Sequence, residues 1–281
     1  EAFLAWLQRN GAQFDGVEWP CTTDSGTRGA VARRDIATGE HMVIIPRQLM
    51  MSEVHAKNDP ELGHVHRANL SVFKNDNGLT LYVMQEMLKG DQSFYWPYLN
   101  ILPKPRNLRH WDDKNLEELQ DPRLVRRNGA RKRHLQALYR HTMGILDSSY
   151  PGLFPTEQYT FELFDFAWGT IQARAFGRRL SCTALVPLAD CLNHGNVQTK
   201  YDFDVEENGV FNRYLKGSEV LNSYGRRTND TLLLEYGFAM PYNEWDEVEL
   251  SCTLSEREPS ADRRREVLSA SGQFSSRYCA P

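Results

Sequence analysis

The chain has 281 residues, of which 41% are hydrophobic and 25% are charged, and its formal net charge is −4 at pH 7. The length suggests one large domain or two modest ones, and the composition is ordinary for a soluble globular protein. The net negative charge gives no support for binding to nucleic acid or to a membrane, and no apolar run approaches the length of a membrane span. Because the chain begins at Glu1 rather than at Met, we expect a piece of a longer protein, so the absence of a targeting segment is uninformative.

Cysteine and histidine spacing argues against a structural metal or a disulfide framework. The cysteines are odd in number and widely spread, without a Cys-x-x-Cys or Cys-x-Cys pair: Cys21, Cys182, Cys191, Cys252 and Cys279. This usage predicts a reducing intracellular compartment, cytoplasmic or nuclear. His64 and His66 form a His-x-His pair with no carboxylate–histidine motif nearby, so a polar loop is favoured over a metal site. No metal is expected.

The N-terminal part is predicted to begin with a helix and continue as a hairpin. Residues 3–7 read as a short helix that Asn10-Gly11 ends. Residues 29–34 and 41–45 read as two short strands, with residues 35–40 as the turn between them.

From about Ser52 the pattern becomes helical. Residues 79–88 predict an amphipathic helix, and residues 112–120 a short helix with acidic residues at its start. Between them, residues 94–105 read as a rigid aromatic connector that is rich in proline. Residues 160–176 predict another amphipathic helix, whose aromatic stripe is typical of a core face.

A basic segment stands out in this helical part. Residues 122–146 contain no Asp or Glu. Their cations are Arg123, Arg126, Arg127, Arg131, Lys132, Arg133 and Arg140. The favoured interpretation is the solvated face of a long helix interrupted at Gly129. The alternative is a docking surface at residues 123–133 for an acidic partner.

After Cys182 the pattern returns to strands. Strands are predicted at 201–205, 210–215 and 219–224, with Asn208-Gly209 as a hairpin turn. A helix is predicted over 228–236, with Gly237 as its C-terminal stop. The order of strands, helices and strands predicts an α+β fold in which a helical insertion interrupts one β unit, because neither β part is large enough to bury a core alone.

Residues 188–194, LADCLNH, gather four reactive side-chain types: Asp190, Cys191, Asn193 and His194. A metal site would need a further ligand, and none is apparent. A cysteine nucleophile would need a base from a distant segment, whereas Cys191 stands in an apolar frame typical of inert packing. Neither reading is favoured.

A second block, GSEVLNSYGRRTNDTLLLEYGF at 217–238, supplies a third reading. Together with Asn193-His194 it resembles the C-terminal half of a SET domain, a family that transfers methyl groups from S-adenosylmethionine to protein side chains, chiefly lysine. The motifs ARAFGR (173–178) and LVPLADCLNH (185–194), followed by Tyr201, are similar to the subfamily of the Rubisco large-subunit lysine methyltransferase and the actin-histidine methyltransferase. The stretch 29–51 resembles the N-terminal strands of that subfamily, and the likeness covers most of residues 3–245.

The resemblance implies a domain plan. It has an N-terminal SET segment at 1–52, a mostly helical insertion at 53–165 and a C-terminal SET segment at 166–245. Members of the subfamily carry a helical substrate-binding domain after the SET segment. Here that domain is largely missing, and residues 246–281 are a tail or a remnant, within which residues 255–272 read as one helix.

The resemblance also implies the site. It makes the hydroxyl of Tyr224 the group nearest the transferred methyl. The cofactor residues that it implies are Gly26, Arg28, Arg174, Asn193, His194, Tyr224 and Tyr236. The substrate residues that it implies are Phe176, Arg178, Asp190, Tyr201 and Tyr236. Many SET domains have Gly-x-Gly where this sequence has Thr27 and Gly29, so the contacts of the 25–32 turn differ from the pattern.

Methyl transfer from a sulfonium to an amine is an in-line displacement that needs alignment, exclusion of water and a neutral amine. It needs neither a nucleophilic protein residue nor a metal. Desolvation among tyrosine rings lowers the pKa of a lysine, and ring faces attract cations. The histidine-methylating branch has Trp and Asn where this sequence has Ala189 and Phe176, so lysine is the expected acceptor. Histidine methylation of a protein and a catalytically weak SET-like binding module remain the alternatives.

Overall fold

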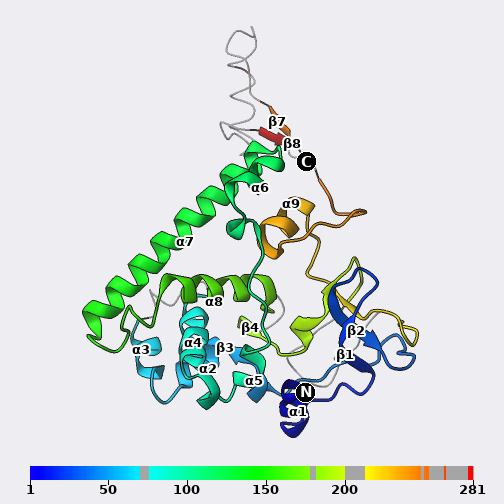
Figure 1. Ribbon diagram of the computed structural model, residues 1–281, viewed down its shortest axis with the longest axis horizontal. Helices are drawn as coiled ribbons and strands as arrows, with labels where there is room; N and C mark the ends of the chain where they lie inside the picture. The colour runs from blue at the N-terminus through cyan, green and yellow to red at the C-terminus, as the bar shows by residue number, and fades with distance from the viewer. Residues whose placement is uncertain are drawn as a thin grey trace.

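The computed structural model describes residues 1–69, 76–177, 182–199, 213–247, 250–252, 263 and 278–280 (Figure 1). The strands are β1 (Val17–Thr22), β2 (Arg28–Ala32), β3 (Met51–Ser52), β4 (Ala184–Leu185), β5 (Asn193–His194), β6 (Leu221–Asn222), β7 (Leu250–Cys252) and β8 (Tyr278–Ala280). The helices are α1 (Ala2–Arg9), α2 (Glu53–Asn58), α3 (Gly63–Ala68), α4 (Asn77–Leu88), α5 (Trp96–Leu99), α6 (Asp113–Glu118), α7 (Pro122–Ser149), α8 (Phe161–Arg174) and α9 (Asn229–Thr231). Single turns are η1 (Arg47–Leu49), η2 (Gly90–Gln92), η3 (Leu108–His110), η4 (Ala189–Cys191) and the π-helical η6 (Leu232–Tyr236). Short strands and many helices confirm the predicted α+β class.

The N-terminal hairpin differs from the prediction. β2 pairs in antiparallel fashion with β1, which the sequence reading missed, and not with residues 41–45. Within 41–45, Ile44 forms an isolated bridge with Gln13. Pro20 lies inside β1 at a shift of register between Glu18 and Cys21, where a residue without an N–H is tolerated. The internal proline therefore concealed a genuine strand.

Strands from the two ends of the sequence pair with each other. β3 is antiparallel to β4, with Met51 opposite Leu185. β2 bridges Glu219 through Val31. β5 and β6 run parallel, with His194 opposite Asn222. The strand predicted at 219–224 is therefore real but shorter. Of the hairpin predicted from strands 201–205 and 210–215, residues 201–212 lie outside the described residues, and Tyr214 forms an isolated bridge with Ile36.

Between β3 and β4 the described chain is helical. Figure 1 shows α2 to α5 gathered below α8, with α7 running obliquely along the side of the molecule. Residues 96–99 form α5 and not an extended connector, because Pro97 occupies the first turn, where a missing N–H costs nothing. α7 continues through Gly129, so the predicted interruption is wrong. A glycine costs about 1 kcal/mol in a helix, and the cap from Asp121 and the buried Leu124 and Leu135 outweigh it.

The core joins these parts. One cluster contains fully buried residues from all of them, such as Leu7, Leu49, Met84, Phe164 and Leu185. A second, small cluster consists of Leu108, Leu116, Leu124 and Leu234. It joins η3, α6 and the start of α7 to η6. None of the helices in the described ranges combines the length and the apolar character needed to cross a lipid bilayer.

Candidate active site

A cavity of about 220 Å³ lies where the end of α8, η4, the stretch after β6 and η6 meet. Its lining consists of Ala173, Arg174, Ala175, Phe176, Gly177, Asp190, Thr199, Asn222, Ser223, Tyr224, Gly225, Arg227 and Tyr236. Five predicted site residues are thus brought together: Arg174, Phe176, Asp190, Tyr224 and Tyr236. The predicted Arg178 and Tyr201 lie outside the described residues.

Tyr224 and Tyr236 line one side of the cavity, and we call these two rings, together with His194 and Phe238 that pack against them, the aromatic wall. The His194 ring stacks on Tyr224 with 5.0 Å between centroids, and Tyr224 stacks on Tyr236 at 5.1 Å. Phe238 meets Tyr236 and Tyr224 at steeper angles. η6 sets the position of Tyr236, and Gly237, with φ +85°, ends it in the left-handed conformation that glycine adopts freely. The wall offers π faces that attract a cation.

Tyr224 is held by its hydroxyl. The hydroxyl donates to the main-chain oxygen of Leu192 at 2.9 Å. Burial raises the pKa of Tyr224 well above its usual value, so the phenol stays protonated at ordinary pH. Because the proton is directed at Leu192, the oxygen lone pairs remain to accept other contacts.

His194 has an unused hydrogen-bonding atom. Its Nδ1 accepts the N–H of Tyr224 at 3.1 Å and also lies 3.4 Å from the main-chain oxygen of Asn222; the shorter contact favours the tautomer with the ring proton on Nε2. Burial lowers the pKa of His194, so the ring is neutral. Within the described residues, the buried Nε2 has no hydrogen-bond partner. A buried donor without a partner is costly, so this atom fits a ligand group.

Arg174 and Asp190 line a second, charged side of the cavity, and we call these two residues, together with Tyr98 that bonds to Asp190, the ionic wall. The Asp190 side chain has no exposed surface and accepts the Tyr98 hydroxyl at 2.6 Å. Nη1 of Arg174 donates to the Asp190 main-chain oxygen at 2.9 Å and lies 3.6 Å from the carboxylate. Burial raises the pKa of Asp190, while Arg174 and Tyr98 oppose that rise. Burial would lower the pKa of Arg174, but Asp190 raises it overall.

The N-terminal turn reaches the site through Asn193. The Asn193 amide donates to Glu219 at 2.8 Å and to the main-chain oxygen of Arg28 at 3.3 Å. A Cβ on Gly29 would lie 2.7 Å from that amide, so the close approach requires glycine. Gly26, with φ +75°, closes the turn by donating its N–H to Thr23.

The side chain of Arg28 leads away from Asn193. Its guanidinium lies over the Trp19 ring and donates to the main-chain oxygen of Ile101. Four predicted cofactor residues, Gly26, Arg28, Asn193 and His194, do not line the cavity. His194 adjoins it through its stack on Tyr224.

Several residues of the site escaped the sequence reading. Phe238 and Asn222 lie within the quoted 217–238 block, so their motif was available as a signal. Thr199 donates to Asn222 at 2.9 Å, and no motif marks it. Tyr98 lies in the aromatic connector, 92 positions from Asp190, with no local signal for its role.

The thiol and metal readings find no support. Cys191 is buried, and burial raises the pKa of its thiol, which keeps it protonated and weakly nucleophilic. His66 is buried in α3 and does not lie in a polar loop. Among the residues that the structure describes, no three His, Cys, Asp or Glu side chains converge as a metal site would need.

No family model matches the chain. It is similar to the ribosomal lysine N-methyltransferase set10 of Schizosaccharomyces pombe (28% identical), to the Rubisco large-subunit N-methyltransferase of Pisum sativum (26%) and to the actin-histidine N-methyltransferase of Homo sapiens (24%). The alignments cover 89%, 99% and 96% of this chain but 46%, 59% and 47% of these relatives. The chain thus spans about half the length of the curated relatives it matches.

The fold is also similar to solved structures. The SET domain of the Rubisco methyltransferase LSMT, solved with lysine and AdoHcy, superposes with a TM-score of 0.77 at 24% identity, over 99% of this chain and 65% of that one. The structure of the same enzyme with AdoMet gives a TM-score of 0.73. The chain therefore has the fold of the LSMT SET domain, and along most of its length it is similar in sequence to Rubisco large-subunit and actin-histidine methyltransferases.

Proposed function

We propose that this protein transfers a methyl group from S-adenosylmethionine to the ε-amine of a lysine in a protein substrate. The observation that carries the proposal is that Arg174, Tyr224 and Tyr236 line one cavity, with Tyr224 and Tyr236 stacked on each other. The names of the set10 and LSMT relatives, which specify lysine or bound lysine and AdoHcy, support it.

The residues present suit the cofactor. When bound, S-adenosylmethionine supplies a methyl group on a positively charged sulfur. The Arg174 guanidinium suits its carboxylate, and the unpartnered Nε2–H of His194 suits an acceptor on it. Asn193 has both a donor and an acceptor and ties the 26–29 turn to this place. The stacked ring of Tyr224 fixes the plane of His194.

The reaction itself is a displacement at carbon. The lysine nitrogen forms the new N–C bond with its lone pair, the C–S bond breaks, and the proton on nitrogen leaves to solvent. The amine must therefore be neutral, although a free lysine has a pKa of about 10.4. Desolvation against the aromatic wall, next to the cation Arg174, lowers that pKa. The free lone pairs of the Tyr224 oxygen accept weak C–H contacts from the methyl in transit.

Lysine is favoured over histidine because Phe176 lines the cavity and Ala189 stands on η4, so an apolar surface faces an aliphatic stem. A histidine acceptor would require a polar partner for its second ring nitrogen. The similarity to actin-histidine methyltransferases keeps histidine as the second candidate. We place the protein in a reducing intracellular compartment, and free thiols at Cys21, Cys182 and Cys191 support this.

We also propose that residues 1–52 and 166–245 form one methyl-transfer unit around the insertion 53–165. The pairing of β3 with β4 supports this division.

The test is labelled methyl transfer into a proteome extract, followed by acid hydrolysis that separates methyl-lysine from methyl-histidine. We expect label in methyl-lysine, together with a rise in Tm on addition of S-adenosylhomocysteine, because a ligand of the folded state stabilises it. Label in methyl-histidine would select the second candidate. Binding without any transfer would select a SET-like binding module, and no change in Tm would contradict the assignment.

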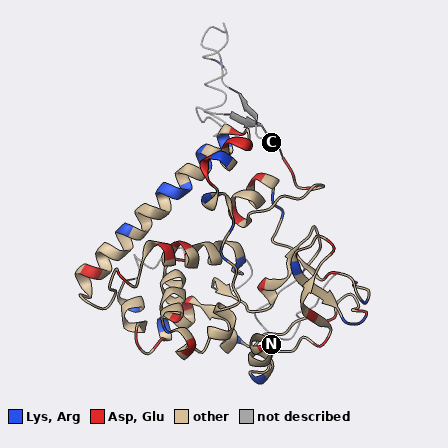
Figure 2. Ribbon diagram, viewed as in Figure 1, with Lys and Arg blue, Asp and Glu red and all other residues tan. Residues whose placement is uncertain are grey.

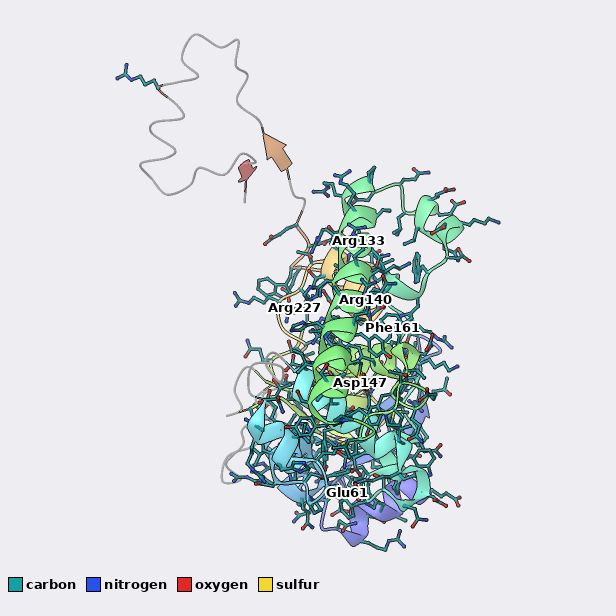
Figure 3. The ribbon with its side chains drawn as sticks, turned by 90° about the vertical axis from the view of Figure 1, so that its left-hand side faces the viewer. Glu61, Arg133, Arg140, Asp147, Phe161 and Arg227 are labelled. Carbon is teal, nitrogen blue, oxygen red and sulfur yellow. The ribbon has the colours of Figure 1, made fainter. Side chains whose placement is uncertain are left out.

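We propose that the substrate protein carries acidic residues that dock on the basic surface of α7. Three cations of the basic segment are already paired within the protein: Arg123 lies 3.4 Å from Asp121, Arg127 lies 3.6 Å from Asp230, and Arg131 pairs with Glu235. Arg126, Arg133 and Arg140, which we call the outer stripe, are exposed and have no ion-pair partner within the described residues. Seven-residue spacing places them on one face over about 21 Å, the length of about six extended residues. Figure 2 shows the blue cations along α7, and Figure 3 shows Arg133 and Arg140 on the face toward the viewer.

Charge reversal tests this docking surface. In the triple variant Arg126→Glu, Arg133→Glu and Arg140→Glu we expect a higher KM for the protein substrate and an unchanged KM for a short lysine peptide. Added salt should raise the wild-type KM toward that of the variant, because exposed charges are screened. The control, Arg9→Glu, Lys104→Glu and Lys114→Glu, changes the net charge equally at exposed positions outside α7. Equal KM values in both variants would contradict docking at α7.

A further inference from the structure

Tyr98 connects the helical stretch to the cavity. It lies on α5, its side chain is fully buried, and its ring packs against Phe3 of α1 at 6.1 Å. Its hydroxyl donates to the Asp190 carboxylate at 2.6 Å, within the range of strong, charge-assisted hydrogen bonds.

Asp190 belongs to the segment 188–194, which is held from three directions. Tyr98 holds its carboxylate, Arg174 of α8 holds its main-chain oxygen, and Tyr224 holds the main-chain oxygen of Leu192. Asn193 and His194 follow directly in the chain and form β5.

The same segment contains a strained residue. Leu188 has φ +71° and ψ −46°, in a region that costs a non-glycine residue of the order of 1–3 kcal/mol. Such a conformation persists only where surrounding contacts hold it. Asp190 lies two residues after Leu188, so the bond from Tyr98 is one of the contacts that oppose relaxation of this turn.

We propose that Tyr98 is a positioning residue for methyl transfer, through which the helical stretch fixes the segment 188–194 and with it Arg174, Asn193 and His194. This inference rests on the proposed function for its kinetic consequence. Tyr98 touches no reacting atom and acts through Asp190. Burial also raises the pKa of the Tyr98 phenol, so the donor is present at every ordinary pH.

The variant is Tyr98→Phe, which removes the hydroxyl and retains the ring contact with Phe3. The matched control is Tyr95→Phe, one turn away. Tyr95 is also buried, but its hydroxyl reaches the main-chain oxygens of Gln48 and Met50 and no residue of the cavity. Both variants lose one buried hydroxyl, and the loss of Tm should be larger for Tyr98→Phe, because its hydroxyl bonds to a buried carboxylate.

For Tyr98→Phe we expect kcat to fall about tenfold, corresponding to a barrier higher by about 1.4 kcal/mol, with KM for a lysine peptide changed far less. For Tyr95→Phe we expect kcat within about twofold of wild type. Hydrogen exchange of the amides at 188–194 should accelerate in Tyr98→Phe alone. Equal kcat values, or equal exchange rates in the two variants, would overturn the proposal. A wild-type protein without transfer activity would overturn the proposed function, and the exchange measurement would still decide whether Tyr98 holds the segment.

Discussion

The aromatic wall and the ionic wall enclose the same cavity but are built in different ways. Three of the four aromatic residues come from one stretch, 224–238, and the rings meet face to face or edge to face at 5.0 to 6.5 Å. The ionic wall brings together residues 98, 174 and 190 from three separate elements, and its bonds measure 2.6 and 2.9 Å. Stacked rings keep their contact when one ring shifts slightly, whereas a buried charge loses its hydrogen bond when its partner shifts.

This difference predicts a division of labour. An aromatic pair contributes about 0.5–1.5 kcal/mol beyond the area it buries, and neighbouring rings compensate when one is altered. Removing one partner of a buried ion pair leaves an uncompensated charge and costs about 3–5 kcal/mol. We therefore expect substitutions in the ionic wall to appear first in stability, and substitutions in the aromatic wall to appear first in catalysis.

The largest effect is expected for Arg174→Met. The variant leaves the Asp190 carboxylate fully buried with the Tyr98 hydroxyl and the weak thiol donor of Cys191 as partners and without a countercharge from residue 174. The free energy of unfolding, measured in urea, should fall by about 3–5 kcal/mol. Adding Asp190→Asn in the same chain removes the stranded charge and should recover part of the loss. A loss below about 1 kcal/mol would mean that Arg174 and Asp190 behave as a solvated pair, and the contrast between the walls would fail.

The aromatic wall is tested by Tyr224→Phe, which retains the stack with His194 and Tyr236. We expect kcat to fall about tenfold to a hundredfold, equivalent to about 1.4–2.8 kcal/mol in the barrier. The loss of one buried hydrogen bond to Leu192 should cost only about 1 kcal/mol of stability. Calorimetry should find the affinity for S-adenosylhomocysteine nearly unchanged. An unchanged kcat would remove the role assigned to the hydroxyl, and a large loss of stability would make the two walls alike.

The same contrast explains how far the site could be predicted from sequence. Tyr224 and Tyr236 could be predicted because they lie in one block with a recognisable spacing, next to a glycine whose left-handed conformation ends η6. The role of Tyr98 could not be predicted, because its partner lies 92 positions away and a buried tyrosine next to a proline is common in any protein core. A hydrogen bond between two separate elements does not alter the sequence periodicity of either element, so sequence patterns do not reveal it.

For the fold, the sequence pattern within an element predicted its type correctly, whereas a proline or glycine that interrupted the pattern did not mark the end of the element. The order of strands, helices and strands led to the correct class. Pro20 concealed β1, because a bulge makes room for a residue that a regular strand excludes. Gly129 suggested a break in α7 that burial on both sides prevents. The predicted helix over 228–236 exists, but it changes to a π-helical turn at Leu232, which apolar periodicity does not report.

The smallest expected effect is a pH dependence of ligand binding that arises in the aromatic wall, at His194. Burial and the nearby Arg227 lower the pKa of His194 below its usual value of about 6.5. Its neutral ring accepts the Tyr224 N–H at Nδ1, whereas a protonated ring would place an Nδ1–H donor opposite the Tyr224 N–H donor. The contribution of His194 is therefore complete above about pH 6.5 and is lost as the pH falls through the lower pKa of the folded state.

We expect the affinity for S-adenosylhomocysteine, measured by calorimetry at pH 7.5, 6.5 and 5.5, to weaken several-fold toward the acid end, and His194→Gln to flatten that trend. Tm would be a poor readout, because burial also lowers the pKa of His66 to about 4, and this residue lies on α3, outside the cavity. His66 destabilises the fold over the same acid range without touching the ligand, so His66→Gln should flatten the pH dependence of Tm and leave that of the affinity intact. If the affinity of the wild type were independent of pH, ligand binding would not depend on a neutral His194 ring. The role assigned to its Nε2 donor would then be wrong.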